Sequence, residues 1–379
     1  MGNRHETSET RWRDEEVNSL AAIQGDRVGL AAVGLGRWGR VLAAAYRDSP
    51  VLELRSCFSR NGDRRARFAA DFGCDADESL ESLLARSDVE GVVVTVPNDQ
   101  HAAVIEAAAE AQKPVFVEKP ISVDPQDVRR IRHAVERSGV VFSCGHSARR
   151  LSGLREIKRL IDSGEIGRPS LVEAVFSNER GLDLKEGDWR GDPLQCPGGP
   201  LTQLGVHQID NLNYLLGTPK RVTGVGRQGL ASATNVMVAA ALIEYDDVIG
   251  YLGTDWLTPG AFTLDVYGSN ARLRYELDFS WWSNSAETDA HSRLVKVAFR
   301  EKDDDPDART LGVDDVALPP RNHLREEIEE FGRAIRGVGT IEVGLTVAIS
   351  NVAVVLAVAR AIERGCKIDV EEVLAELMA

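Results

Sequence analysis

Arg27-Val28-Gly29-Leu30-Ala31-Ala32-Val33 runs directly into Gly34-Leu35-Gly36-Arg37-Trp38-Gly39, and this stretch decides the fold. Its first half is apolar enough for a buried β-strand, and a helical pattern begins soon after the glycines. In such a context the first glycine permits a tight turn, the second lets the backbone approach a pyrophosphate, and the third lets helix and strand pack closely. The stretch therefore predicts a dinucleotide-binding unit whose helix N-terminus supplies amide donors to phosphates.

The first half of the chain alternates predicted strands with predicted helices. Apolar runs typical of strands recur at 51–59, 91–96, 115–120 and 140–143, as expected for a parallel sheet covered on both faces. Polar groups lie at the ends of two of these runs: Thr95, Pro97, Asn98 and His101 at one, Glu118 and Lys119 at the other. Because parallel strands present their carboxyl ends at one edge of a sheet, these groups are expected to converge. For His101, packing against the alanine-rich helix that follows is the alternative.

The residues after the second predicted strand bear on the choice of cofactor. Sites selective for NAD often carry an Asp or Glu there, which accepts a hydrogen bond from the adenine-side ribose. This chain has Ser59, Arg60 and Asn61 instead, and a hydroxyl beside a guanidinium suits a 2′-phosphate. The pattern slightly favours NADP over NAD. Alternatively, the arginines of this region simply begin the solvated helix expected over 64–72.

Length and composition indicate a soluble protein of two domains. The chain of 379 residues is too long for one ordinary core, and its formal net charge of −14 argues against a nucleic-acid or membrane partner. Five cysteines without CxxC spacing suggest neither a disulfide framework nor a metal site, which fits a reducing, cytoplasmic location. Residues 1–26 lack the apolar core of a signal peptide and are expected to form a flexible tail. The uncharged run 343–359 is predicted to be a buried core helix, because polar residues interrupt it.

The second half has the composition of a separate α+β unit. A helix is expected over 154–163, and strand-like segments follow at 171–176, 222–226, 236–245, 248–252, 262–267 and 271–277. Strands that follow a βα half indicate a mostly antiparallel sheet. The expected fold class is therefore α/β, with a dinucleotide-binding domain over 27–148 and a domain with a large open sheet over 149–379. Such a sheet offers a face for self-association, and the acidic stretch 301–307 is predicted to be a loop.

The stretch Gly198 to Gly217 is the informative part of the second half. If it is helical over 201–216, the three- and four-residue spacing places Gln203, His207, Asp210 and Tyr214 along one face. A histidine on such a face is either a structural or a catalytic residue, and its polar neighbours on both adjacent turns leave the two readings in balance.

Four motifs together resemble the glucose-fructose oxidoreductase / inositol dehydrogenase / rhizopine-catabolism (Gfo/Idh/MocA) family. They are GLGRWG from Gly34, VPNDQH from Val96, VEKP from Val117 and GGPLTQLGVHQID from Gly198. The resemblance extends from about Arg27 to the C-terminus. It implies an N-terminal Rossmann domain, an open-sheet second domain, an active site between them, and frequent assembly into homodimers or homotetramers. It also implies oxidation or reduction of one hydroxyl carbon of a sugar, cyclitol or related polyol.

Carried over residue by residue, the resemblance implies a cofactor side and a substrate side. The cofactor side would comprise Gly34, Gly36, Arg37, Trp38, Gly39, Ser59, Arg60, Thr95, Pro97, Asn98, His101 and Glu118, the last on the nicotinamide ribose. Lys119 would lie between the nicotinamide and the substrate, and His207 would contact the reacting hydroxyl.

One position departs from the family pattern. Four residues before the histidine, inositol dehydrogenase-like members usually have an Asp, whereas this chain has Gln203. Glutamine does not titrate, so an Asp–Lys proton relay is not available. Proton transfer would then depend on His207, Lys119 or a substrate-linked water. The glutamine also argues against inositol as the expected substrate.

The resulting hypothesis is an NAD(P)-dependent oxidoreductase in which His207 takes the hydroxyl proton and Lys119 stabilises the alkoxide or acts as the base itself. Gln203 and Asp210 would hold the imidazole or a substrate hydroxyl. Further candidates for substrate contact are His146, Arg149, Arg180 and Trp189, although a solvated loop residue explains each of them equally well. Two rival functions are a glycosidase or lyase that oxidises a sugar transiently, and a regulatory protein that senses a dinucleotide.

Overall fold

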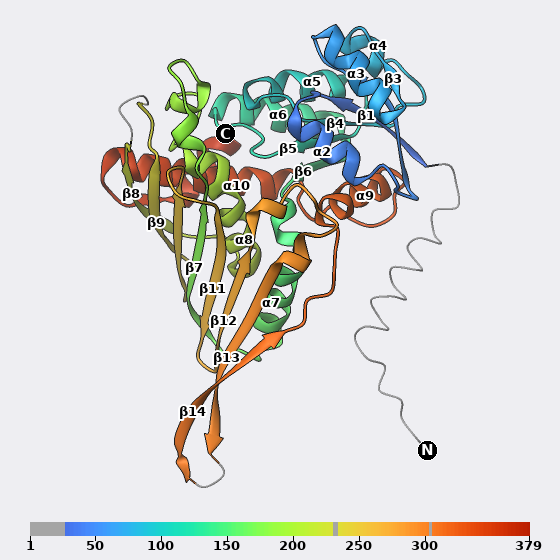
Figure 1. Ribbon diagram of the computed structural model, residues 1–379. Coiled ribbons are helices and arrows are strands. Elements are labelled where there is room, and N and C mark those ends of the chain that lie inside the picture. The colour runs from blue at the N-terminus through green and yellow to red at the C-terminus, as the bar shows by residue number, and fades with distance from the viewer. Residues whose placement is uncertain (1–26, 230–233, 303–304) are drawn as a thin grey trace, which may run out of the picture.

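The computed structural model describes residues 27–229, 234–302 and 305–379, and places them in two sheets joined by helices (Figure 1). The expectation of a flexible tail over 1–26 falls outside the described residues. The smaller sheet and its intervening helices hold residues 28–145, and the strands of the larger sheet come from residues 169–369.

The smaller sheet has six strands, in the order β3-β2-β1-β4-β5-β6. Their bounds are β1 Val28–Val33, β2 Leu52–Phe58, β3 Asp75–Ala76, β4 Gly91–Val94, β5 Val115–Glu118 and β6 Phe142–Gly145. All neighbouring pairs are parallel. The strand order reverses between β1 and β4, and in open α/β sheets such a point opens a crevice at the carboxyl ends of the strands. Its helices are α2 Arg37–Ala45, α3 Gly62–Phe72, α4 Leu80–Leu84, α5 His101–Glu110 and α6 Pro125–Ser138. The Rossmann prediction is confirmed.

The larger sheet has nine strands, in the order β14-β13-β12-β11-β7-β10-β9-β8-β15. Their bounds are β7 Pro169–Ser177, β8 Arg221–Arg227, β9 Val238–Glu244, β10 Ile249–Asp255, β11 Ala261–Gly268, β12 Ala271–Leu277, β13 Ser292–Lys302, β14 Asp305–Val316 and β15 Ile368–Asp369. Only β7 and β10 pair in parallel, so the sheet is mostly antiparallel, as predicted.

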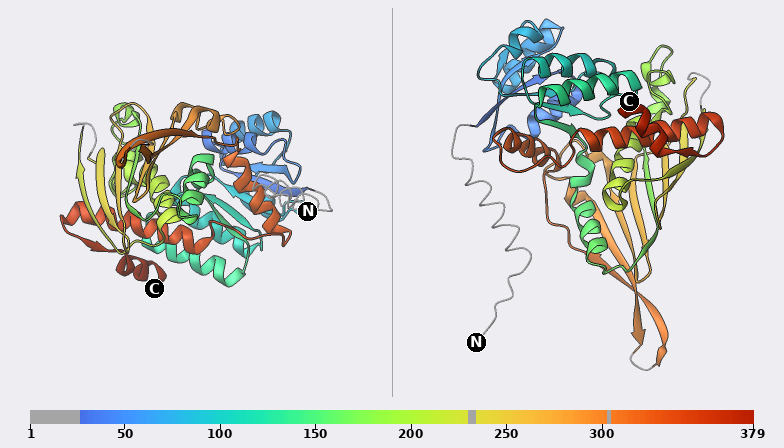
Figure 2. Two further views of the ribbon diagram at one scale, coloured as in Figure 1. Left: turned by 90° about the horizontal axis from the view of Figure 1, so that it is seen from below. Right: turned by 180° about the vertical axis from the view of Figure 1, so that it is seen from behind.

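Helices cover one face of the larger sheet. They are α7 Ser152–Asp162, α8 Val206–Leu216 and α10 Leu345–Arg364, and they lie together on one side of the strands (Figure 2). Helix α10 is long and apolar enough to cross a membrane by length and composition. In the fold it is an interior helix, because every residue from Asn351 to Val358 is buried. The terminal helix α11 Val370–Met378 packs against α10.

Two regions differ from the sequence-based expectation. The acidic stretch 301–307 was predicted to be a loop, but strand β13 continues to Lys302 and β14 begins at Asp305, so the described residues of the stretch belong to two paired strands that project from the sheet (Figure 1). The second region is α9, His323–Ile335, which returns to the smaller sheet after the larger one is complete. Leu324, Ile328 and Phe331 on α9 join the core formed by β1, α2 and β2.

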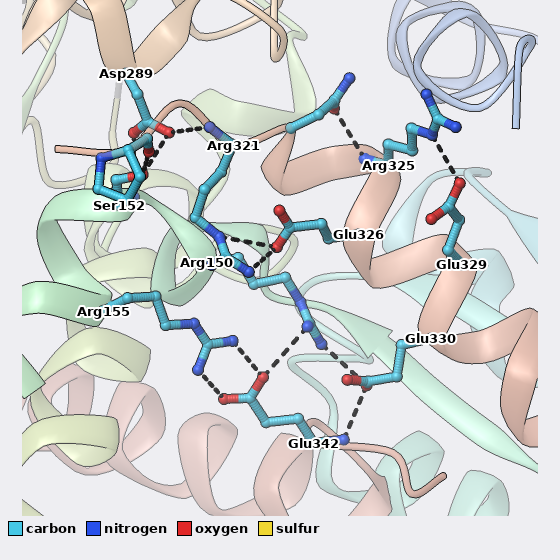
Figure 3. Close-up of polar contacts among 12 residues, drawn as sticks. Arg150, Ser152, Arg155, Asp289, Arg321, Arg325, Glu326, Glu329, Glu330 and Glu342 are labelled. Carbon is cyan, nitrogen blue, oxygen red and sulfur yellow. Dashed lines mark hydrogen bonds and ion pairs between the residues drawn. The ribbon is translucent and has the colours of Figure 1, made fainter. Parts of the chain in front are cut away.

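Ion pairs hold α9 against the segment that links the two sheets (Figure 3). Arg150 follows β6 directly and donates to Glu330 of α9 at 2.9 Å, and it also pairs with Glu342 at 3.3 Å. Arg155 of α7 donates to both oxygens of Glu342, at 2.8 and 2.6 Å. Arg150 is buried, so these contacts fix the junction between the two halves more firmly than exposed pairs would.

Candidate active site

The glycine-rich turn has the geometry that a dinucleotide requires. Gly34 has φ +95°, a conformation that favours glycine, and a side chain there would collide with the Thr95 backbone. Around Gly36 no atom lies within 4 Å of where a Cβ would stand, and α2 has no side-chain cap because its N-cap residue is this glycine. The first amides of α2 are therefore available to an anion. Gly39 lies outside the cavity lining and instead lets α2 pack on the Gly34 carbonyl.

A cavity of about 1190 Å³ extends from this turn to the larger sheet. Most of the predicted cofactor residues line it: Gly34, Gly36, Arg37, Trp38, Ser59, Arg60, Thr95, Pro97, Asn98, Glu118 and Lys119. Asn98 Nδ2 is a buried donor without a partner among the described protein atoms. Because buried donors are normally satisfied, such a group in a cavity fits a polar ligand. The residues present thus fit a dinucleotide.

At the ribose end the cavity is basic. Arg60 donates to Gln100 at 3.1 Å, and Asn61 caps α3 by accepting from the Arg64 amide. A second cavity of about 520 Å³ adjoins the first and is lined by Leu35, Gly36, Arg37, Arg40, Asn61, Asp63, Arg64, Arg67 and Asp71. Arg40 is paired with Asp71 at 2.5 Å, whereas Arg64 lines both cavities.

Lys119 stands at the carboxyl end of β5 and reaches across to the other half of the chain. Its Nζ donates to the backbone carbonyl of Gln203 at 3.0 Å. Gln203 belongs to a π-helical turn, Leu201–Gly205, where a regular α-helix was predicted. π-Helical turns often occur at functional sites. Burial lowers the pKa of Lys119, and the neighbouring Glu118 carboxylate partly offsets this effect. Burial also raises the pKa of Glu118 to about 7.

His207 begins the second turn of this helical segment and faces the same cavity. Its ring packs against Phe176 and Trp282, with centroids 5.7 and 5.3 Å away. Burial, and then the charges of Lys119 and two other histidines, lower its pKa well below the usual value, so the ring is neutral. Nδ1 is buried without a partner among the described protein atoms.

The loop after β7 supplies the outer wall. Arg180 and Trp189 line the cavity as predicted, and Arg190 stacks on Trp189 with its guanidinium carbon 4.3 Å from the ring centre. The connection between β12 and β13 contributes Trp282 and Ser283, and Arg37 reaches Ser283 at 3.4 Å. The placement of Trp282 and Ser283 in the cavity wall was not predicted, because an aromatic pair between two strands is typical of packing.

Besides Gly39, the structure does not bring four of the predicted residues to the cavity lining. His101 is fully buried, and its ring nitrogens lie 3.1 and 3.0 Å from the Ile121 and Val96 carbonyls, so it pins two loops together. The other three lie behind His207. Asp210 accepts from Arg149 Nε at 2.9 Å and Nη2 at 2.5 Å, while His146 Nδ1 lies 3.6 Å from it.

Comparisons with known proteins agree with this geometry. A family model described as the oxidoreductase family with an NAD-binding Rossmann fold matches residues 28–146, and the GFO/IDH/MocA C-terminal domain model matches residues 154–274. A solved structure from Desulfitobacterium hafniense, provisionally assigned as an NADPH-dependent oxidoreductase, is 47% identical with a TM-score of 0.89. That match covers 93% of this chain and 100% of the other.

Among curated relatives, the dTDP-3,4-didehydro-2,6-dideoxy-alpha-D-glucose 3-reductase of Saccharopolyspora spinosa is 26% identical over 82% of this chain and 87% of its own. The 2,7-anhydro-N-acetylneuraminate hydratase of Mediterraneibacter gnavus is 30% identical, but the match spans 52% of each chain. A levoglucosan dehydrogenase in complex with NADH shares the fold with a TM-score of 0.78 at 18% identity.

Proposed function

This chain belongs to the Gfo/Idh/MocA family of oxidoreductases, and from that premise we propose that it transfers a hydride between NADP(H) and a hydroxyl or keto carbon of a sugar-like polyol. One observation carries the proposal: Lys119 from the Rossmann half and His207 from the other half line a single cavity with the glycine-rich turn. When bound, the nicotinamide supplies or accepts the hydride. The protein positions the carbon and moves the proton.

The proton step is assigned to the two basic residues. In the oxidation direction, the neutral imidazole of His207 accepts the hydroxyl proton, and the ammonium group of Lys119 donates a hydrogen bond to the developing alkoxide. The hydrogen bond from Lys119 to the Gln203 carbonyl holds Nζ at the boundary between the two halves. Gln203 itself orients the substrate without titrating.

Wall residues with hydrogen-bonding or stacking groups support a polyhydroxylated substrate. Arg180 and Arg190 offer donors, and the ring of Trp189 offers an apolar face for a sugar ring. We do not assign Asp210, His146 and Arg149 to direct substrate contact. Their side chains contact one another outside the cavity lining.

A panel of sugars, cyclitols and their keto derivatives, assayed by absorbance with each nicotinamide, tests the proposed function. Lys119→Met should reduce turnover by about 10²- to 10⁴-fold while the protein still binds dinucleotide. Near-wild-type turnover of this variant would sink the assignment. Bond cleavage or hydration without net conversion of the cofactor would favour the glycosidase or lyase alternative instead.

The preference for NADP rests on the arginines at the ribose end. The positions where NAD-selective sites often carry an Asp or Glu are occupied by Ser59, Arg60 and Asn61. Arg64 lines both cavities. Replacing Arg64 with Ala should weaken NADPH binding by about 10- to 100-fold, the worth of one charged hydrogen bond, and leave NADH binding unchanged. Equal losses for both cofactors would show that Arg64 does not read the 2′-phosphate.

We also propose that the chain is a homo-oligomer associated through the larger sheet, in the cytoplasm. The face opposite α7, α8 and α10 carries no described helix, and large apolar side chains on the strands are exposed, including Leu242, Leu311 and Val313. The cysteines are unpaired. Light scattering on the wild type and on a Leu311→Glu, Val313→Glu variant should show a multimer that the substitutions weaken.

A further inference from the structure

Behind His207 lies a second group of buried polar side chains that the proposed mechanism does not use. His323 and Glu327 are one turn apart on α9 and are 0% and 2% exposed. Both ring nitrogens of His323 and both carboxyl oxygens of Glu327 lack a hydrogen-bond partner among the described protein atoms. His207 Nδ1 has the same status. These residues are called the unpaired cluster below.

The members of the unpaired cluster adjoin the reaction site. The rings of His207 and His323 pack on the same Trp282, with centroids 5.3 and 5.2 Å from it. Helix α9 also contacts β5, because the ring centroids of Phe331 and Phe116 lie 6.0 Å apart. His323 thus shares Trp282 with His207, and Glu327 lies one turn along α9 from His323.

Five unsatisfied polar atoms in one region are too costly to be an accident of packing. Each buried group without a partner costs about 1 to 3 kcal/mol, and natural proteins usually satisfy such groups with ordered water when protein atoms do not. Water and neutral histidine can each accept a proton at one atom and donate a proton from another. Water that satisfied these atoms would therefore also offer a path for protons.

We propose that Glu327 is the proton reservoir for His207, connected to it through His323 and buried water. The inference rests on the proposed function. In the reduction direction, His207 Nε2–H protonates the substrate alkoxide, Nδ1 takes a proton from the relay, and Glu327 changes from carboxylic acid to carboxylate. In the oxidation direction each transfer reverses, so one proton leaves the substrate hydroxyl and one arrives at Glu327.

The surroundings of Glu327 suit a group that begins in the acid form. His323 lies one turn away on the same helix, and the charges of Glu118 from β5, Asp210 from α8, Glu330 from α9 and Arg150 act on Glu327, which in turn acts on the Cys144 thiol of β6. Burial, followed by the Glu118 charge, raises the pKa of Glu327 well above its usual value. Arg150 does not cancel this effect because it is already paired with Glu330 and Glu342. Because Gln203 stands where relatives usually have an Asp and does not titrate, the proton for His207 has to come from another group.

Glu327→Gln tests the proposal, because it keeps the shape and removes the exchangeable carboxyl proton. We expect kcat to fall by about 10²-fold with KM and dinucleotide affinity unchanged, and we expect the pH profile of kcat to change shape. Glu326→Gln is the matched control. Glu326 is on the same helix, but its carboxylate is bound by Arg321, so its loss should leave kcat and the pH profile as in the wild type.

A second pair of measurements separates failure of this inference from failure of the proposed function. The infrared difference between wild type and Glu327→Gln at neutral pH should contain a protonated carboxyl band, whether or not a substrate is known. His323→Gln should retain that band and lose turnover. Absence of the band, or a Glu327→Gln enzyme with wild-type rate and pH profile, overturns the inference. Absence of wild-type turnover across the whole panel overturns the proposed function.

Discussion

Two groups of buried charged and polar side chains include residues of α8, and they are built on opposite principles. Arg149, Asp210 and Asn351 form a paired cluster, in which the carboxylate accepts two bonds from the guanidinium and one from the amide at 2.6 Å. By contrast, the unpaired cluster of His207, His323 and Glu327 leaves five atoms without described protein partners. A satisfied network fixes positions, whereas an unsatisfied one leaves groups able to exchange protons.

The largest effect is expected on kcat when His207, the member of the unpaired cluster that lines the cavity, is replaced. His207→Asn should lower kcat by about 10²- to 10⁴-fold, because the group assigned to accept the hydroxyl proton is removed. The melting temperature should change little, since the ring nitrogen Nδ1 makes no described bond to protein. Steady-state kinetics and a thermal melt of one preparation measure both. A rate within twofold of wild type would contradict the role.

Breaking the paired cluster should have the opposite signature. Asp210→Asn leaves the Arg149 charge buried without its counterion, which should cost about 3 to 5 kcal/mol of unfolding free energy in urea. Asp265→Asn is a matched control, because Asp265 also holds an arginine with two bonds, but that arginine is half exposed. There we expect no more than about 1 kcal/mol. Equal losses of unfolding free energy at both positions would show that burial does not make the ion pair of Arg149 and Asp210 more important than the exposed one.

The two clusters should respond to pH with opposite sign. Glu327 has a raised pKa in the folded state, so the stability that its acid form provides is present at low pH and is lost as pH rises through that value. Glu327→Gln should therefore gain about 1 to 3 kcal/mol on the wild type as pH is raised. Melts of both proteins between about pH 5 and 9 measure this difference. A constant difference across that range would argue against a buried titrating acid.

Asp210 behaves the other way. Burial raises its pKa, but Arg149 and the further contacts outweigh burial and bring the pKa below its usual value. Its contribution is present above the unfolded-state pKa and disappears as pH falls through the folded-state value. The stability gap between wild type and Asp210→Asn should thus narrow in acid. A gap that widens in acid would show that the carboxylate is not the stabilising form.

The smallest effect on stability is expected when a peripheral member of the paired cluster is replaced and the bonds between Arg149 and Asp210 remain. Asn351→Ala removes one hydrogen bond to Asp210 and one to Asn213, while the arginine bonds remain. We expect a loss of about 1 to 2 kcal/mol by urea denaturation and no change in kcat. A large loss of kcat would mean that the paired cluster also orients substrate.

Local patterns predicted much of this molecule. The glycine-rich turn, the position of Lys119 at a strand end and the placement of His207 on a helix all depend on short spacings. Strand β12 was predicted with its observed bounds, Ala271–Leu277. What failed depends on contacts between distant residues: Arg149 meets Asp210 across 61 positions, and nothing local distinguishes it from a solvated arginine.

Helix α9 shows both the limit and a signal that was available. Its return to the Rossmann sheet follows from no local pattern, because an apolar stripe does not specify its partner. Within that stripe, however, His323 and Glu327 alternate with Leu324 and Ile328, and charged residues on a buried face indicate either a pair or a function. The π-helical turn at Leu201–Gly205 was missed because its sequence suits an α-helix equally well.

The return of α9 also determines how the cleft can move. The chain crosses between the halves after β6, again when α9 packs on the smaller sheet, and once more as it enters α10. Three covalent connections, with Arg150 and Glu342 pinning them together, oppose the rotation that a single linker would permit. We therefore expect a cleft of nearly constant width.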